Sequence, residues 1–250
     1  MQVGLLNNHS ALLLACYTSA MSPESHVLPT AGGEGLAVSR AMEAAAGIRD
    51  RISEGDLRPG DRVPEAKLAD ALGVSRNTLR EAFRSLSNEG LISQIPNRGA
   101  YVAIPNINTI IDIYRVRRLI ECQAVAESLP KHPALIPMRA AVEAALEQRA
   151  EDDWSAIAGS NIKFHQAIFE LADSPRLNRL FTQLTTELRL AFGLIDDPEY
   201  LHAPFLERNL EILERIEAGE TQQAAALLKD YLFLAERILL AGYERLERAN

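Results

Sequence analysis

The sequence GVSRNTLREAFRSL occupies residues 73–86 and combines a helix start with a row of positive charge. Ser75 is a residue type favoured at the N-cap, and it predicts a helix that ends at about residue 88. Arginines recur every fourth residue at Arg76, Arg80 and Arg84, so three guanidinium groups lie along one side of this helix. Its other side is apolar and predicts packing into a core: Leu79, Ala82, Phe83 and Leu86.

A second helix is predicted directly before it, from about Pro64 to Leu72, with an apolar inward side. Gly73 then stands at the position that helices favour for a C-cap. A helix, a glycine turn and a helix in this order form the helix-turn-helix pattern, whose second helix enters the major groove of DNA.

A further helix is predicted from Ser39 to the Pro-Gly turn in GDLRPGDR, residues 55–62. Its apolar residues recur at spacings of three and four, and we expect them to face inward: Met42, Ala45, Ile48 and Ile52.

The segment EGLISQIPNRGAYVA, residues 89–103, alternates like two short strands around a turn at residues 96–99. A hairpin directly after a recognition helix is a wing, and Arg98 at its tip is suited to phosphate or to the minor groove. The alternative is that the arginines form only a solvated helix face, with Glu81 and Glu89 as counter-charges. The ordered combination of cap, turn, apolar side and wing favours DNA binding over that alternative.

Composition permits this function. The 250 residues carry a formal net charge of −8, but the acidity is uneven. Residues 39–103 contain ten Lys and Arg against nine Asp and Glu, whereas residues 104–250 contain sixteen against twenty-three. Hydrophobic residues make up 47% of the chain, as in soluble globular proteins. The two cysteines show no metal-binding or disulfide spacing, and we expect a cytoplasmic protein without a membrane segment.

Three regions are expected. Residues 1–38 are Gly-, Pro- and Ser-rich towards their end and lack the positive n-region of a secretory signal, so they predict a flexible arm. Residues 39–104 form the winged helix-turn-helix domain. Residues 105–250 show helical periodicity with breaks at LPKHP, ADSP, DDPEY and AGE, and they predict an antiparallel bundle of about six or seven helices. The fold class is therefore mainly α.

Residues 48–103, above all LADALGVSRNTLREAFRSLSNEGLI and NRGAYV, resemble the winged helix-turn-helix of the GntR family of bacterial transcription regulators. The resemblance implies a set of base and phosphate contacts at the start of the recognition helix, with a glycine in the wing. The matching residues are Arg76, Asn77, Thr78, Arg80 and Gly99. Two positions depart from the family, because Ala66 stands where an arginine is frequent and Thr78 where proline is usual.

Physical chemistry assigns these residues their tasks. Arg76 or Arg80 can bind guanine O6 and N7 through two hydrogen bonds. The hydroxyls of Ser75 and Thr78 suit phosphate oxygens. Lys67, beside Ala66, can supply a phosphate contact in place of the missing arginine.

The second half resembles the FCD effector domain of the FadR-type branch through YRVRRLIE (114–121), NIKFHQAIFELADSPRLNRLF (161–181) and ILERIEAGETQQAAALLKDYL (212–232). Many such domains hold a divalent metal with one Asp and three His, and those positions map here to Asn161, His165, Asn209 and Tyr231. Three of the four ligands are replaced, so we expect no metal and no other cofactor. Instead, these side chains are expected to bind an organic effector directly, with Arg117 binding its carboxylate. The alternative for His165 is a histidine buried in the core.

Together these features predict a transcriptional regulator that binds an inverted-repeat operator in double-stranded DNA as a homodimer. We expect a repressor that a small organic acid releases from DNA. A regulator whose effector domain no longer binds any ligand is the main alternative. An enzyme is not expected, since the sequence contains no nucleophile motif, no Glu-x-x-His repeat and no Gly-rich phosphate loop.

Overall fold

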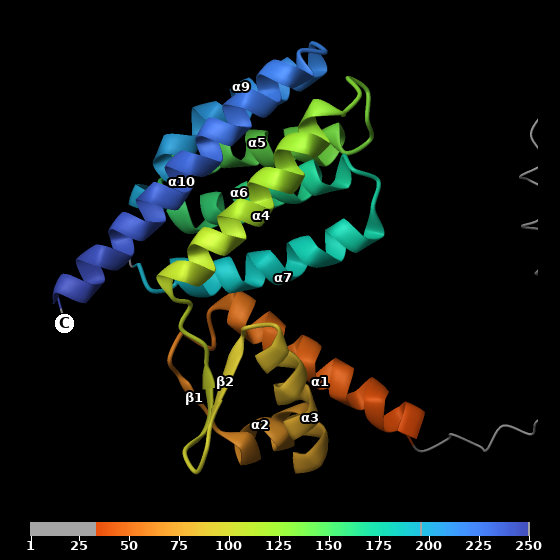
Figure 1. Ribbon diagram of the computed structural model, residues 1–250, viewed down its shortest axis with the longest axis vertical. Helices are drawn as coiled ribbons and strands as arrows, with labels where there is room; N and C mark the ends of the chain where they lie inside the picture. The colour runs from red at the N-terminus through yellow and green to blue at the C-terminus, as the bar shows by residue number, and fades with distance from the viewer. Residues whose placement is uncertain (1–33, 196, 250) are drawn as a thin grey trace, which may run out of the picture. The chain divides into compact units, whose positions relative to one another are not determined.

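The helix-turn-helix predicted from the sequence is present in the computed structural model, which describes residues 34–195 and 197–249 (Figure 1). Helices α1 (Glu34–Glu54), α2 (Glu65–Leu72) and α3 (Arg76–Asn88) are joined by short turns. Gly73 ends α2 in the left-handed conformation, at φ +63°, and its amide donates to the last carbonyls of that helix. Ser75 begins α3, because its hydroxyl oxygen accepts a hydrogen bond of 3.1 Å from the amide of Thr78.

The predicted wing is also present, and it belongs to a sheet of three strands. Strands β2 (Ile92–Ile95) and β3 (Gly99–Val102) form the antiparallel hairpin, with Ile95 opposite Gly99. Strand β1 (Arg62–Val63) pairs with the other edge of β3, so the order is β1-β3-β2. We did not predict β1, because two residues are too few to show an alternating pattern.

The core of this domain contains the predicted apolar side of α3. The prediction that Met42 faces inward is wrong, because its side chain is 68% exposed while Ala44 and Ala45 are buried. The periodicity placed the apolar side of α1 slightly off its true position, since alanines are too small to outweigh a methionine in a hydrophobic pattern.

The first helix begins earlier than predicted. Residues 34–38, assigned to the arm from the sequence, form the first turn of α1. The glycines of residues 32–35 suggested a loop, but a glycine inside a helix costs only about 1 kcal/mol and does not stop it. The remainder of the predicted arm, residues 1–33, lies outside the described residues.

The second half is a bundle of helices, as predicted. Its longer helices are α4 (Ile107–Ala126), α5 (Leu135–Ala150), α6 (Trp154–Glu170), α7 (Pro175–Phe192), α9 (Leu206–Glu217) and α10 (Thr221–Ala249). Helix α10 packs along α4, and α5 packs against α6 (Figure 1). One apolar core runs through these helices, with large buried side chains such as Phe164, Phe169 and Met138 at its centre.

A short additional helix, α8 (Pro198–His202), lies where the sequence indicated only a break. Asp197 caps it by accepting a hydrogen bond of 2.9 Å from the amide of Tyr200. A 3₁₀ turn, η1 (Ala203–Phe205), follows directly. This compact segment turns Leu201, His202 and Phe205 into the interior of the bundle.

No helix within residues 34–195 and 197–249 combines the length and the apolar character needed to cross a bilayer.

Candidate DNA-binding surface and effector site

The residues predicted to contact DNA lie on the surface of the winged domain. Most are exposed, and Thr78 and Gly99 are half-buried. The exposed members are Lys67, Ser75, Arg76, Asn77, Arg80 and Arg98. Ser75 also has an internal task, because its hydroxyl lies 2.8 Å from that of Thr78 and caps the helix. Their role in binding DNA stays a prediction.

The charge of the arginine row is only partly balanced. Arg80 lies 3.5 Å from Glu65 of α2, in a solvent-exposed ion pair. Glu89 pairs with Arg49 of α1 at 2.7 Å, so it does not act as the counter-charge considered from the sequence. Within the described part of the chain, Arg76 and Arg84 have no ion-pair partner, which leaves positive charge on this face of α3.

A shallow groove of about 430 Å³ connects α3 with the hairpin. Arg80 and Arg84 line one side of it, and Gln94 and Asn97 of the hairpin line the other. The recognition helix and the wing therefore present polar and cationic groups on one continuous surface, as a reader of DNA requires.

The helical domain contains a partly open cavity of about 40 Å³. Its walls come from α4, α6, α7, α8, η1 and α10, and they are mostly apolar. Four of the five residues predicted to bind an effector line this cavity: Arg117, Asn161, His165 and Tyr231. Asn209 of α9 reaches it through Asn161, whose Oδ1 accepts a hydrogen bond of 2.9 Å from the Asn209 side chain.

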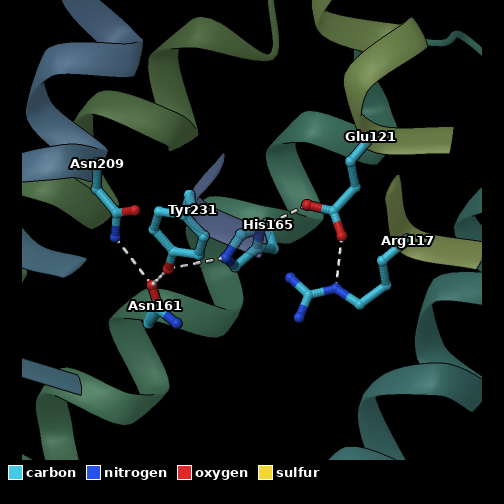
Figure 2. Close-up of polar contacts among 6 residues, drawn as sticks. All are labelled: Arg117, Glu121, Asn161, His165, Asn209 and Tyr231. Atoms are coloured by element: carbon cyan, nitrogen blue, oxygen red, sulfur yellow. Dashed lines mark hydrogen bonds and ion pairs between the residues drawn. The ribbon is translucent and has the colours of Figure 1, made fainter. Parts of the chain in front are cut away.

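A chain of hydrogen bonds joins these groups (Figure 2). Arg117 Nε donates to Glu121 Oε1 at 2.6 Å, and the other oxygen of Glu121 lies 2.6 Å from His165 Nδ1. The hydroxyl of Tyr231 lies 3.1 Å from His165 Nε2 and donates to Asn161 Oδ1 at 2.9 Å. Four helices thus contribute to one polar cluster inside an apolar core, and this fixes the orientation of each member.

The charges in the cluster are balanced. Burial by itself would raise the pKa of Glu121, but Arg117 and His165 outweigh it and hold that pKa below its ordinary value. Burial lowers the pKa of His165, which favours the neutral imidazole. Burial raises the pKa of Tyr231, so the phenol stays protonated. The result is one cation, Arg117, and one anion, Glu121, in direct contact and away from water.

Arg117 has capacity left for a ligand. The residue is 6% exposed, and Nε makes the bond to Glu121. Figure 2 shows the two terminal nitrogens directed towards His165 and Tyr231, away from Glu121. The guanidinium also lies 5.2 Å from the centroid of the Tyr114 ring, and it forms a hydrogen bond with the Tyr114 side chain. A guanidinium carries five N–H donors, so these contacts leave N–H groups that a carboxylate can accept.

The side chains present do not fit a divalent metal. At the four mapped positions, Asn161 Oδ1 already accepts two hydrogen bonds, and both ring nitrogens of His165 have partners. Tyr231 is a protonated phenol, which is a poor ligand. Residues 34–195 and 197–249 contain no group of three His, Cys, Asp or Glu side chains with the spacing of a metal site. That the protein works without a metal stays a prediction.

Two members of this site were not predicted. Glu121 was part of the quoted segment YRVRRLIE, and its position four residues after Arg117 on one helix was a sequence signal for an ion pair. His202 gave no such signal, because it lies in a short helix between longer ones. It is buried and lines the same cavity.

Comparison with known proteins agrees with these observations. The family model for bacterial regulatory proteins of the gntR family matches residues 40–102, and the FCD domain model matches residues 112–233. A solved structure of a GntR transcriptional regulator from Rhodococcus sp. RHA1 is 38% identical, with a TM-score of 0.75. The similarity covers 81% of this chain and 98% of that one.

Curated relatives show the same pattern. The probable D-xylose utilization operon transcriptional repressor of Paenarthrobacter nicotinovorans is 26% identical over 75% of this chain and 85% of its own length. The Nta operon transcriptional regulator of Aminobacter aminovorans is 41% identical over 69 residues, which are 28% of this chain and 33% of the regulator. These relatives are transcriptional regulators, not enzymes. The chain belongs to the GntR family, in the FadR-type branch, and is a DNA-binding transcriptional regulator with an FCD effector domain.

Proposed function

We propose that this regulator is a repressor that binds an inverted-repeat operator as a homodimer and leaves the DNA when a small carboxylate binds in the helical domain. The observation that carries this proposal is the buried Arg117 guanidinium, which lines the cavity and directs its terminal nitrogens away from Glu121. A carboxylate can accept two parallel hydrogen bonds from such a guanidinium.

The proposed inverted-repeat operator follows from the two-fold symmetry of a homodimer. One recognition helix reads only a few base pairs, whereas two related by a two-fold axis read half-sites one helical turn apart. A homodimer therefore predicts an inverted repeat.

Helix α7 provides a route between the cavity and the winged domain. Leu188 and Phe192 of α7 line the cavity. On the same turns of the helix, Leu190 is buried in the apolar cluster of the winged domain, and Arg189 donates a hydrogen bond to the carbonyl of Ser53 at the end of α1. A ligand that displaces α7 changes contacts at both places. A coupling free energy of about 1 to 3 kcal/mol is enough for regulation.

The first test is a thermal-shift screen of the full chain after EDTA treatment, with small carboxylic acids and with divalent metals. A functional pocket raises the melting temperature when its ligand is present. Acids that do so are then added to the protein bound to fluorescent operator DNA, selected beforehand from a random library. Loss of anisotropy supports release from DNA, and an unchanged signal contradicts it.

Arg117→Lys is the informative variant in this assay. It keeps a positive charge beside Glu121 but loses the planar pair of donors. The acid should then bind about ten-fold or more weakly. Arg115→Ala is the matched control, since Arg115 lies on the same helix and its side chain is exposed.

A regulator that ignores small molecules is the second candidate, and the size of the cavity favours it. About 40 Å³ is well below the roughly 150 Å³ that accommodates benzene in an engineered protein cavity. This function predicts sequence-specific DNA binding with no stabilisation by any acid or metal, and no effect of Arg117→Lys on DNA affinity.

A further inference from the structure

His202 is a buried histidine in the same cavity, outside the positions that the FCD resemblance marks. It ends α8, is 5% exposed and lines the cavity together with Leu201 and Phe205 of the same short segment. Its ring and that of Phe192 of α7 form a T-shaped pair, with ring centroids 5.6 Å apart.

The ring nitrogens of His202 have no partner. Neither forms a hydrogen bond with any residue that the structure describes. The polar cluster is different, because there His165 and Tyr231 are bonded to their neighbours. Burial lowers the pKa of His202 to about 4, so the imidazole is neutral near pH 7 and offers one donor and one acceptor. In the described residues, the fully buried side-chain atoms without a partner belong to Ser87, Asn178, Asn209 and Tyr243, so the His202 nitrogens reach the accessible space of the cavity. A water molecule or a polar group of a ligand in the cavity can bond to them there.

The other residues that line the cavity indicate the chemical character of a ligand that would bind His202. Three phenylalanines, Phe181, Phe192 and Phe205, line the cavity with several aliphatic side chains. A sugar acid or a polyhydroxylated acid would lose hydrogen bonds to water on entering such a wall. A ligand with an aromatic or branched aliphatic group would instead gain apolar contact with these side chains.

We propose that His202 is a specificity-determining residue that hydrogen-bonds a single hydroxyl or carbonyl group on an aromatic or branched aliphatic monocarboxylate. This rests on the proposed function, in which Arg117 binds the carboxylate. The two polar anchors hold the ends of an otherwise apolar ligand.

Such a ligand needs more room than the cavity offers, so part of the wall has to move. Helix α8 and η1 together span only residues 198–205, and they carry His202. Movement of this short segment enlarges the cavity without breaking a long helix. His202 then closes on the ligand because it has no competing hydrogen bond in the protein.

The test compares the affinities of acids with and without a hydroxyl group, in the wild type and in variants of His202. Isothermal titration calorimetry on the full, EDTA-treated chain compares benzoate with the three monohydroxybenzoates, and isovalerate with 2-hydroxyisovalerate. In the wild type, at least one hydroxylated acid should bind about ten-fold more tightly than its parent. His202→Phe should remove this preference, so that the ratio of the two affinities falls to about one whatever happens to the affinity for the parent acid. His202→Gln, which keeps a donor and an acceptor, should retain part of the preference.

Controls separate this inference from the proposed function. His132→Gln, a change in another histidine outside the cavity, should leave every affinity unchanged. If no acid binds the wild type, both proposals fail. If parent acids bind and Arg117→Lys weakens them, but the hydroxyl preference persists in His202→Phe, the proposed function stands and the role of His202 is refuted. An equal loss for parent and hydroxylated acids in both His202 variants also refutes it.

Discussion

Replacing Glu121 with leucine should destabilise the helical domain strongly. The Glu121 carboxylate is 0% exposed and receives two short contacts, from Arg117 Nε and from His165 Nδ1, each at 2.6 Å. Glu121→Leu leaves the Arg117 guanidinium buried without its counter-ion. Breaking one side of a buried ion pair costs about 3 to 5 kcal/mol. In a chain of this size each kcal/mol corresponds to about 2 to 4 °C, so we expect the melting temperature to fall by about 6 to 20 °C.

The double variant Arg117→Met, Glu121→Leu tests the cause. It removes both charges, so the large penalty should disappear and leave about 1 to 3 kcal/mol for the unpaired His165 nitrogen. Urea unfolding followed by circular dichroism gives the free energies. Glu143→Leu, at an exposed ion pair, is the control and should change stability by less than about 0.5 kcal/mol. A cost below 1 kcal/mol for Glu121→Leu, or no recovery in the double variant, would refute the reasoning.

Three further predictions concern the DNA surface, pH and metal. Arg80→Ala should weaken specific DNA binding by about 1 to 3 kcal/mol in anisotropy titrations, and unchanged affinity and sequence preference would remove Arg80 from the interface. Glu89 has a lowered pKa because Arg49 donates two hydrogen bonds to it, at 2.7 and 2.8 Å. The contribution of this ion pair to folding stability is therefore fully present above the ordinary carboxyl pKa, and it is lost as the pH falls through the lowered value. Glu89→Gln should therefore cost about 1 kcal/mol in urea unfolding at pH 7, and this cost should shrink as the pH falls below the ordinary carboxyl pKa, whereas a cost independent of pH would contradict the assignment. EDTA followed by added Zn²⁺, Mn²⁺ or Ni²⁺ should leave the melting temperature unchanged, and a rise of several degrees with one of them would show that the metal-free prediction is wrong.

Local chemistry explains why the winged domain was predicted well. The Gly73 cap, the Ser75 cap and the apolar side of α3 each depend on residues within a few positions of one another. Strand β1 was missed because its two residues become a strand only through pairing with Tyr101 and Ala100, far away in the sequence. Such tertiary pairing leaves no local pattern.

The composition of the candidate effector site followed in part from the sequence, and for a different reason. Resemblance to a family identified Arg117, Asn161, His165 and Tyr231, which the structure brings to one cavity. The pairing of Arg117 with Glu121 could have been read from their spacing of four residues. The position of His202 could not, because it depends on how α8 turns between two long helices. Spacing along one helix is encoded locally, whereas burial of a short connecting segment depends on the whole bundle.

The position of Tyr231 on the last helix has a consequence for synthesis of the protein. Its hydroxyl connects to Asn161 and His165, and α10 packs along α4 at the beginning of the domain. The ribosome makes the amino-terminal helix-turn-helix first and α10 last, so a growing chain acquires its DNA-reading helix before its effector site exists. Under the proposed function, a nascent chain therefore carries its DNA-reading helix before any metabolite can control it, and control begins when the final helix docks.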